Sequence, residues 1–427
     1  MKSCKYFILV LILFVYVYIP VYPQNKSFDD NYSGRVLNHI TEITKFGTRQ
    51  IGSPGAVLTA GYIKSQFKKA GLDATVEPFY SYHYKLNSIK FTSGNKDWKV
   101  EFMGFDPYKE KFDFSGKYIL LDALQEKDIA QIAGKVVIAG TSSNFFQLMM
   151  LKPMAVLFFS NADLEEIKKN NDTSFTLHIE GKLEKIKNAN IIGILPSAVK
   201  TDKEIIITAH YDSYQSSPAA NDNGTGIGTL IELAKIFSSQ NENKTANIKF
   251  IALDGEESGM LGARMYVKSH LEDLKNCLLV FNIDTIGGEG ALTVETVGGE
   301  SKEIAKGKNN VPDYLTDKIL EGLDGSWRII SPEIMNCLMA SNNPGWLKKF
   351  FDEAALEEKI EITHGKNFFS DQRMFAQAGI PETGIAQKTG SKILHSVNDN
   401  IERIKSEMIK NGGAICYSVI IKVMRMK

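Results

Sequence analysis

The chain has 427 residues, of which 43% are hydrophobic and 23% charged, so it is long enough for two domains with ordinary packed cores. Lysine plus arginine number 50, as do aspartate plus glutamate. This balance gives no reason to expect nucleic acid or an anionic membrane as a partner, and it leaves the oligomeric state open.

An apolar run lies at the N-terminus, after Lys2 and Lys5. It spans Tyr6 to Ile19, and Pro20 then interrupts it. The run is shorter than the about 20 residues that cross a bilayer and is typical of a secretory signal. We therefore predict a signal peptide over residues 1–24, a secreted or periplasmic protein, and no stable membrane span. An uncleaved N-terminal anchor is the alternative.

Two helices and a strand are predicted over residues 25–83. Apolar residues recur at helical spacing between positions 36 and 46 and again between 57 and 67, with Gly47 and Gly71 after them. Residues 74–80 (ATVEPFY) alternate as a strand does. We interpret this segment as the N-terminal part of the main domain.

Residues 84–187 are predicted to form a β-rich insert. Short β-like runs dominate it, including GKVVIAG and MAVLFFS, with the helix-like FFQLMMLK between them. The segment lacks the acidic motifs of the later chain. His83 and His178 are interpreted as surface or packing residues rather than ligands.

Strands alternate with helices over residues 188–427. Strands are predicted at 188–195, 205–210 and 278–283 and within IKFIALD, and helices at 225–238, 258–270, 312–323, 344–359, after a capping Ser370, and at 406–424. This alternation predicts an α/β fold with a mixed, largely parallel central sheet flanked by helices.

Acidic and imidazole side chains follow these strands. They are His210, Asp212, Asp222, Glu256, Glu257, Asp284 and His395. The carboxyl ends of parallel strands meet in one crevice, so these side chains can converge. Each acid alone is more often a cap or a surface charge, but the series predicts a site for a divalent metal.

The motifs of this region resemble peptidase family M28, the dizinc exopeptidases. In chain order they are AHYDS, PAANDNGTG, LDGEESGMLGARMYV, FNIDTIG, FSDQRMFAQAGIP and HSVNDNIERI. The resemblance covers residues 188–427 well and residues 30–80 loosely, through FGTRQIGSPG. It implies a zinc-exopeptidase fold (phosphorylase/hydrolase-like) with a protease-associated-like insert.

The resemblance also implies two zinc ions per chain. Asp222 would bridge them, His210 and Asp284 would complete the ligands of one ion, and Glu257 and His395 those of the other. Each ion would keep an open position, which is the mark of a catalytic zinc site.

Three more acids are given roles beside the ligands. Glu256 is the predicted general base, because a carboxylate beside the metal can take a proton from water. Asp212 is the predicted partner that orients a ligating imidazole. For Asp371, ligand support and helix capping are both left open.

Two points at the C-terminal motif qualify the resemblance. His364 is a rival to His395, which has the better motif context. Some relatives have tyrosine immediately before the final histidine, where this chain has Leu394. The donor to the developing oxyanion is therefore not identified.

The most favoured function is that of a secreted zinc aminopeptidase acting on peptides. The alternatives are a dipeptidase or carboxypeptidase-like enzyme, a glutaminyl cyclase, and a non-catalytic binding module. The presence of His210 with Asp222 and Asp284 favours two zinc ions and hydrolysis. Residue specificity is left open, as is disulfide pairing among Cys277, Cys337 and Cys416.

Overall fold

The structure is a computed structural model that describes residues 28–29, 31–102, 111–121, 129–140, 153–170, 172–214, 217–240, 244–297, 341–365, 370–387 and 393–426. The predicted signal segment 1–24, the helix-like segment 145–152 and the helix at 312–323 lie outside these residues. Among the described helices, none is both long enough and apolar enough to span a membrane.

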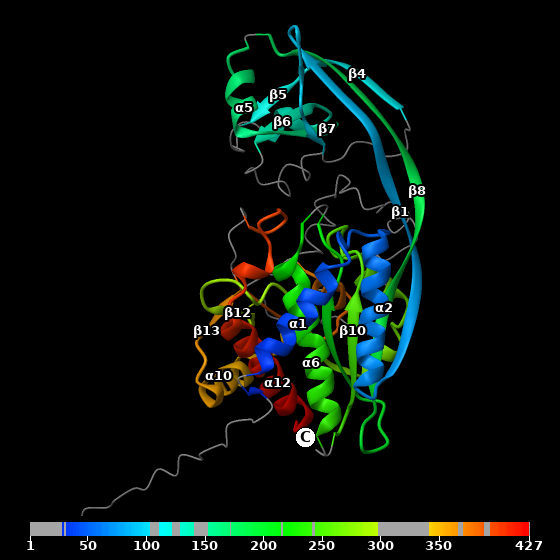
Figure 1. Ribbon diagram of the computed structural model, residues 1–427, viewed down its shortest axis with the longest axis vertical. Coiled ribbons are helices and arrows are strands. Elements are labelled where there is room, and N and C mark those ends of the chain that lie inside the picture. Colours follow the sequence, from blue (N-terminus) through cyan, green and yellow to red (C-terminus); the bar gives the residue numbers. More distant parts are fainter. Residues whose placement is uncertain are drawn as a thin grey trace, which may run out of the picture.

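One large sheet organises the main body (Figure 1), in the order β13-β12-β14-β11-β9-β10-β8-β1-β2. Its strands are β13 (Ile362–Gly365), β12 (Leu292–Glu295), β14 (Glu382–Gln387), β11 (Cys277–Ile283), β9 (Glu204–His210), β10 (Asn247–Leu253), β8 (Ser174–Leu195), β1 (Asp73–Ser93) and β2 (Lys96–Trp98), with β4 (Lys111–Lys117) also paired to β8. The central strands β14, β11, β9 and β10 are parallel neighbours, whereas β8 joins β10 antiparallel. The predicted mixed α/β sheet is confirmed.

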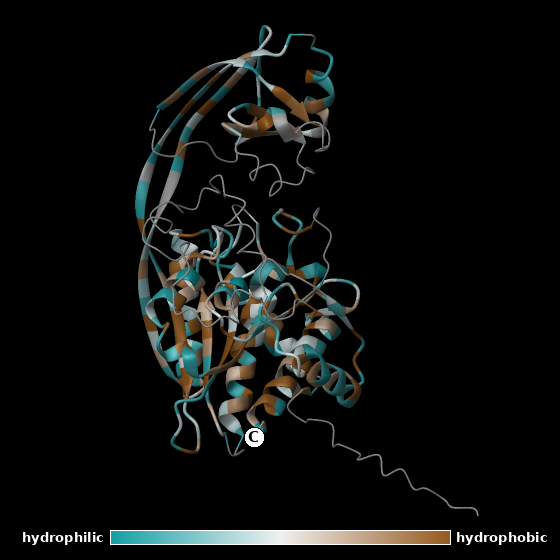
Figure 2. Cartoon of the chain, turned by 180° about the vertical axis from the view of Figure 1, so that it is seen from behind, coloured by the Kyte–Doolittle hydropathy of each residue, from teal (hydrophilic) through white to brown (hydrophobic). Residues whose placement is uncertain are grey.

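Helices cover both faces of this sheet. One face packs against α1 (Tyr32–Thr44), α2 (Pro54–Lys69), α6 (Gly226–Ser239), α10 (Leu347–Glu358) and α12 (Ser406–Met424), and the other against α7 (Leu261–Ser269) and α11 (Gln372–Gln377). Successive residues of β9 enter opposite cores: Ile205 and Ile207 face the first set of helices and Ile206 the second. Hydrophobic residues accordingly concentrate in the strands of the main body (Figure 2). Within the described residues Cys277 and Cys416 are buried and form no disulfide, and Cys337 lies outside these residues.

The helix predicted over 258–270 begins later than expected, at Leu261. Gly255, Gly259 and Met260 have φ values of 78°, 99° and 58°. This left-handed backbone interrupts a right-handed helix. Glu256 and Glu257 therefore lie in a turn that precedes the helix, not in its first turn.

A second, four-stranded sheet forms the core of the β-rich segment, in the order β3-β7-β6-β5. Its strands are β3 (Glu101–Phe102), β7 (Ala155–Phe159), β6 (Val136–Gly140) and β5 (Ile119–Leu121). The long antiparallel strands β1 and β8 connect it to the main body (Figure 1). Strand β1 continues across the predicted boundary at 83/84, and strand β8 across the one at 187/188. The division into residues 25–83, 84–187 and 188–427 stays a prediction.

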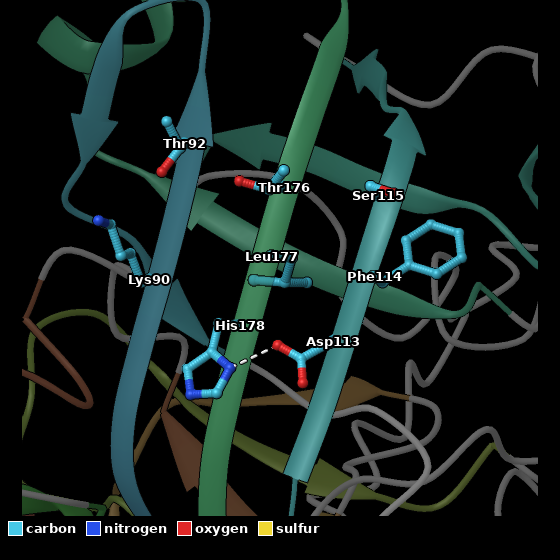
Figure 3. Close-up of a pocket in the computed structure, with 8 residues that line it drawn as sticks. All are labelled: Lys90, Thr92, Asp113, Phe114, Ser115, Thr176, Leu177 and His178. Carbon is cyan, nitrogen blue, oxygen red and sulfur yellow. Dashed lines mark hydrogen bonds and ion pairs between the residues drawn. The ribbon is translucent and has the colours of Figure 1, made fainter.

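Side chains alternate across the far half of β8. Phe175 and Leu177 are buried in the core of the smaller sheet, while Thr176 and His178 belong to the polar face of the three strands β1, β8 and β4 (Figure 3). On that face His178 Nδ1 lies 2.6 Å from Asp113 Oδ1. His178 is thus a surface residue paired with an exposed carboxylate, in agreement with its interpretation from the sequence.

A buried carboxylate, Glu232 of α6, ties this helix to α1. It accepts hydrogen bonds from Arg35 Nε and Lys235 Nζ, each at 2.7 Å, and lies 3.1 Å from His39 Nε2. Burial alone would raise the pKa of Glu232, but these partners lower that pKa to about 2.

We expect Glu232→Gln to lower the free energy of unfolding at pH 7 by about 3 kcal/mol. The folded-state pKa lies below the unfolded value of about 4.3. The contribution of the carboxylate is therefore complete well above that value and is lost as the pH falls toward 2. Urea unfolding of the wild type and of Glu232→Gln between pH 7 and pH 3 measures this contribution. If the difference between their free energies of unfolding does not decrease as the pH falls, the prediction is contradicted.

Candidate metal centre

Three of the five predicted ligands come from the ends of neighbouring parallel strands. Strand β9 ends at His210, the turn after β10 carries Glu257, and Asp284 follows β11 directly. Asp222 lies in the segment Ala220–Thr225 that leads into α6, where its own backbone angles (φ -107°, ψ 88°) are not helical. His395 comes from the segment before α12. Each of the five predicted ligands therefore comes from a different segment of the chain.

The structure brings these five residues together in two groups that share Asp222. In the first group, His210 Nε2 lies 3.2 Å from Asp222 Oδ1 and 3.5 Å from Asp284 Oδ1. In the second, His395 Nε2 lies 3.2 Å from Asp222 Oδ2 and 3.1 Å from Glu257 Oε2. The two oxygens of one carboxylate thus face two different imidazoles.

These contacts have the spacing of ligands around an ion. Ligand atoms about 2.1 Å from a tetrahedral zinc ion lie roughly 3.4 Å from one another, and the four distances in this structure run from 3.1 to 3.5 Å. His210 is 1% exposed, yet in the described part of the chain neither of its ring nitrogens makes a hydrogen bond, and neither does Asp284 Oδ1. Buried polar atoms are rarely left without a partner, and a bound cation would provide one. The imidazole and carboxylate donors suit zinc.

The carboxylates give the centre a strongly negative potential. Burial opposes a charge on His210 and His395, but the surrounding acids raise the pKa of His210 well above its usual value and that of His395 to about 11. Burial, together with Asp222, raises the pKa of Glu257 to about 7. A cation between these groups, whether a proton or a metal ion, is therefore strongly favoured.

Asp212 connects two of the ligand segments. Its carboxylate accepts hydrogen bonds from the backbone N–H groups of Glu256 at 3.0 Å and Glu257 at 3.1 Å, and its Oδ1 lies 3.4 Å from His210 Nδ1. Glu256 belongs to neither ligand group. Burial, reinforced by nearby acids, raises the pKa of the Glu256 carboxyl well above its usual range.

Asp371 and Ser370 adjoin the first ligand group. Asp371 is fully buried, its carboxylate oxygens make no hydrogen bond within the described residues, and its side chain does not cap α11. Burial raises the pKa of Asp371 well above its usual value. Ser370, expected to cap this helix, instead donates its hydroxyl to Asp284 Oδ2 at 2.8 Å. Ser370 is too early to cap α11, because this helix begins at Gln372 and Asp371 is at its N-cap position. The serine instead supports a candidate ligand.

His364 lies apart from both ligand groups. It belongs to β13, an edge strand of the sheet, where its Nε2 lies 2.7 Å from Asp352 Oδ1 and its Nδ1 lies 2.8 Å from Thr296 Oγ1. Of the two rival histidines, the structure brings only His395 to the other predicted ligands.

Arg49 is a residue of the centre that sequence reasoning missed. It is completely buried and donates three hydrogen bonds, to the carbonyl oxygens of Tyr211, Pro218 and Ala219, at 2.8, 3.0 and 2.8 Å. These carbonyls belong to the loop that links His210 to Asp222. The available signal was the place of Arg49 in the FGTRQIGSPG segment.

Asp399 is the second residue missed. Its two carboxylate oxygens accept hydrogen bonds from the backbone N–H groups of Asn221 at 2.8 Å and Asp222 at 2.9 Å. Asp399 follows His395 in HSVNDN. Its hydrogen bonds therefore connect the backbone of Asp222 to the segment that carries His395. The motif itself was visible in the sequence, but the partners of this acid were not.

Comparison with known proteins supports the resemblance seen in the motifs. Residues 190–319 match the model described as peptidase family M28, so this segment carries the domain of that family. Aminopeptidase YwaD of Bacillus subtilis is 38% identical over 150 residues, which are 32% of this chain and 32% of that protein. The chain thus matches about a third of the length of this curated relative.

Solved structures share the fold over most of the chain. An aminopeptidase from Aneurinibacillus sp. strain AM-1 has a TM-score of 0.67 at 18% identity, covering 93% of this chain and 94% of that one. A zinc aminopeptidase from Bacillus subtilis has the same TM-score of 0.67 at 20% identity, covering 91% and 94%. At these identities the likeness establishes the fold.

Proposed function

We propose that this chain is a secreted zinc aminopeptidase, which removes N-terminal residues from peptides with two zinc ions and Glu256 as general base. The observation that carries the proposal is the pair of ligand groups that share Asp222. Similar proteins named aminopeptidase and zinc aminopeptidase support the reaction and the metal. The apolar run from Tyr6 to Ile19 supports secretion.

The metal ligands are divided between two ions in this proposal. His210, Asp222 and Asp284 would hold one zinc ion, and Asp222, Glu257 and His395 the other. Three protein ligands leave an open position at each ion. Zinc held in such a site supplies Lewis acidity, which polarises a bound carbonyl and lowers the pKa of water.

Glu256 carries the proton transfers. Its carboxylate takes one proton from the attacking water as the new C–O bond forms, and returns it to the leaving amine as the C–N bond breaks. Asp212 supports this role, because its hydrogen bond to the backbone N–H of Glu256 fixes the base next to the ligand Glu257. Asp371 is proposed to support the first ligand group, since it makes no capping hydrogen bond to α11.

A mixed peptide pool tests the reaction itself. The zinc-loaded protein is incubated with free-amine, N-acetylated, dipeptide and N-terminal glutamine peptides, and the products are identified by mass spectrometry. We expect residues to be lost from free N-termini only. Trimming of blocked peptides or cleavage restricted to dipeptides would indicate the dipeptidase or carboxypeptidase alternative. Ammonia loss from glutamine without cleavage would indicate a cyclase, and an unchanged pool would overturn the proposed activity.

Metal analysis of two histidine variants tests the second ligand group. We expect His395→Ala to lower the zinc content from two ions to about one per chain, because it removes the only imidazole of that group. His364→Ala is the matched control and should keep both ions, since His364 contacts Asp352 and Thr296 instead. The reverse pattern, measured by elemental analysis after gel filtration, would exchange the two assignments.

A further inference from the structure

The ring of Tyr214 lies against the imidazole of His395. The ring centroids are 4.7 Å apart and the planes differ by 20°, which is a stacked arrangement. Tyr214 comes from the loop after β9, whereas His395 comes from the segment before α12. The stack therefore joins two segments that each supply candidate ligands.

His395 has little else to set the plane of its ring. Its side chain is 50% exposed, and its contacts with Asp222 and Glu257 are both made by Nε2. Within the described part of the chain, no hydrogen bond to its Nδ1 occurs. His210 differs, because it is 1% exposed and its Nδ1 is turned toward the Asp212 carboxylate, although at 3.4 Å the two do not make a hydrogen bond. In metal sites the second nitrogen of a ligating histidine normally faces a carboxylate, a carbonyl or water.

The loop that carries Tyr214 is itself well anchored. The backbone N–H of Arg49 donates to Ser213 Oγ at 2.9 Å, and the N–H of Ser217 donates to the Tyr214 carbonyl at 2.9 Å. The hydroxyl of Ser217 then donates to the carbonyl of Ser396, next to His395, at 3.1 Å. A ring mounted on this loop can hold a neighbouring side chain in one orientation.

We propose that Tyr214 is a positioning residue for His395: its ring, in place of a hydrogen bond at Nδ1, keeps Nε2 directed at Asp222 and Glu257. The inference rests on the proposed function for the ligand role of His395. The other tyrosine of this loop, Tyr211, has a different task, because it is 2% exposed and its hydroxyl donates to the Ala189 carbonyl at 2.8 Å.

Zinc titration of three Tyr214 variants tests the inference without reference to peptidase activity. Metal-free protein is titrated with zinc against a chromophoric chelator, which reports the number of ions and the affinity of each site. We expect Tyr214→Leu to weaken one of the two sites roughly 3- to 10-fold, the range for loss of one aromatic pair. Tyr214→Phe keeps the ring and should bind both ions as the wild type does. Tyr214→Gln is a second ring-free variant in case Tyr214→Leu does not fold.

Tyr266 provides a matched control away from the ligands. It stacks on His270 at 4.3 Å between centroids with planes 28° apart, and His270 pairs with Glu77 rather than with the candidate ligands. We expect Tyr266→Leu to lower the melting temperature and to leave both zinc affinities unchanged. This control distinguishes the general effect of losing a Tyr–His stack from the specific effect of losing the stack on His395.

The outcomes distinguish the inference from the proposed function. A wild-type protein that binds fewer than two zinc ions would overturn the two-zinc centre, and with it the proposed function. A wild type that binds two ions, with folded Tyr214→Leu or Tyr214→Gln of equal affinity, would overturn only the role of Tyr214. Equal weakening in Tyr214→Phe would also overturn it, because the hydroxyl and not the ring would then be responsible. A changed absorption spectrum of one Co(II) ion in the ring-free variants would support the inference.

Discussion

Replacing Glu256 by glutamine is expected to lower kcat by roughly 10²- to 10⁴-fold, the usual contribution of a general base. Glutamine has nearly the same shape but cannot accept the proton from water. Glu256 is in neither ligand group, so the variant should still bind two zinc ions. The backbone N–H that donates to Asp212 also remains, and the turn should keep its geometry.

Steady-state kinetics with a free-amine peptide, combined with zinc analysis of the same samples, checks this expectation. Glu257→Gln is the matched control, because it alters the neighbouring carboxylate that contacts His395 at 3.1 Å. That variant should lose zinc as well as activity. Unchanged turnover in Glu256→Gln would remove Glu256 from the mechanism, and loss of zinc from it would make Glu256 a ligand.

The candidate ligands could be predicted from the sequence because each has a local signal. His210 and Asp284 end or follow buried apolar runs, and parallel strands must end at a common edge. Such reasoning needs only the order of strands and the position of an acid after each. The structure accordingly brings all five predicted ligands into two groups.

The supporting residues could not be predicted in this way. Arg49 donates to backbone carbonyl groups. Because every residue has such a carbonyl, the residue types of these partners do not indicate the contact. Asp399 likewise accepts from backbone N–H groups far away in the sequence. Ser370 precedes a helix, which is the usual place of a cap, and only the fold shows that its hydroxyl is turned toward Asp284. Tertiary hydrogen bonds, most of them to the backbone, are therefore the part of this centre that a single sequence hides.

Arg49 leads to the second large expected effect, on stability and metal content together. Its guanidinium is buried, and its charge is stabilised by four acids of the centre: Asp212, Asp399, Asp222 and Glu257. Burial lowers the pKa of Arg49 to about 10, so the group stays charged at neutral pH. Arg49→Met removes this charge and the three hydrogen bonds that the guanidinium donates to carbonyl groups. We expect the free energy of unfolding to fall by about 3 to 5 kcal/mol.

The zinc content of Arg49→Met should fall as well, because the loop between His210 and Asp222 would lose its anchor. Urea unfolding and zinc titration of the same preparation measure the two effects. Arg35→Met is the matched control: it removes a partly exposed arginine that pairs with Glu232, outside the centre, and should cost stability but keep both ions. Arg49→Lys keeps the charge, but one ammonium cannot replace a planar guanidinium that donates to three carbonyls in different directions. It should therefore recover part of the stability. Wild-type zinc affinity in Arg49→Met, at whatever stability, would show that the loop holds its ligands without the arginine.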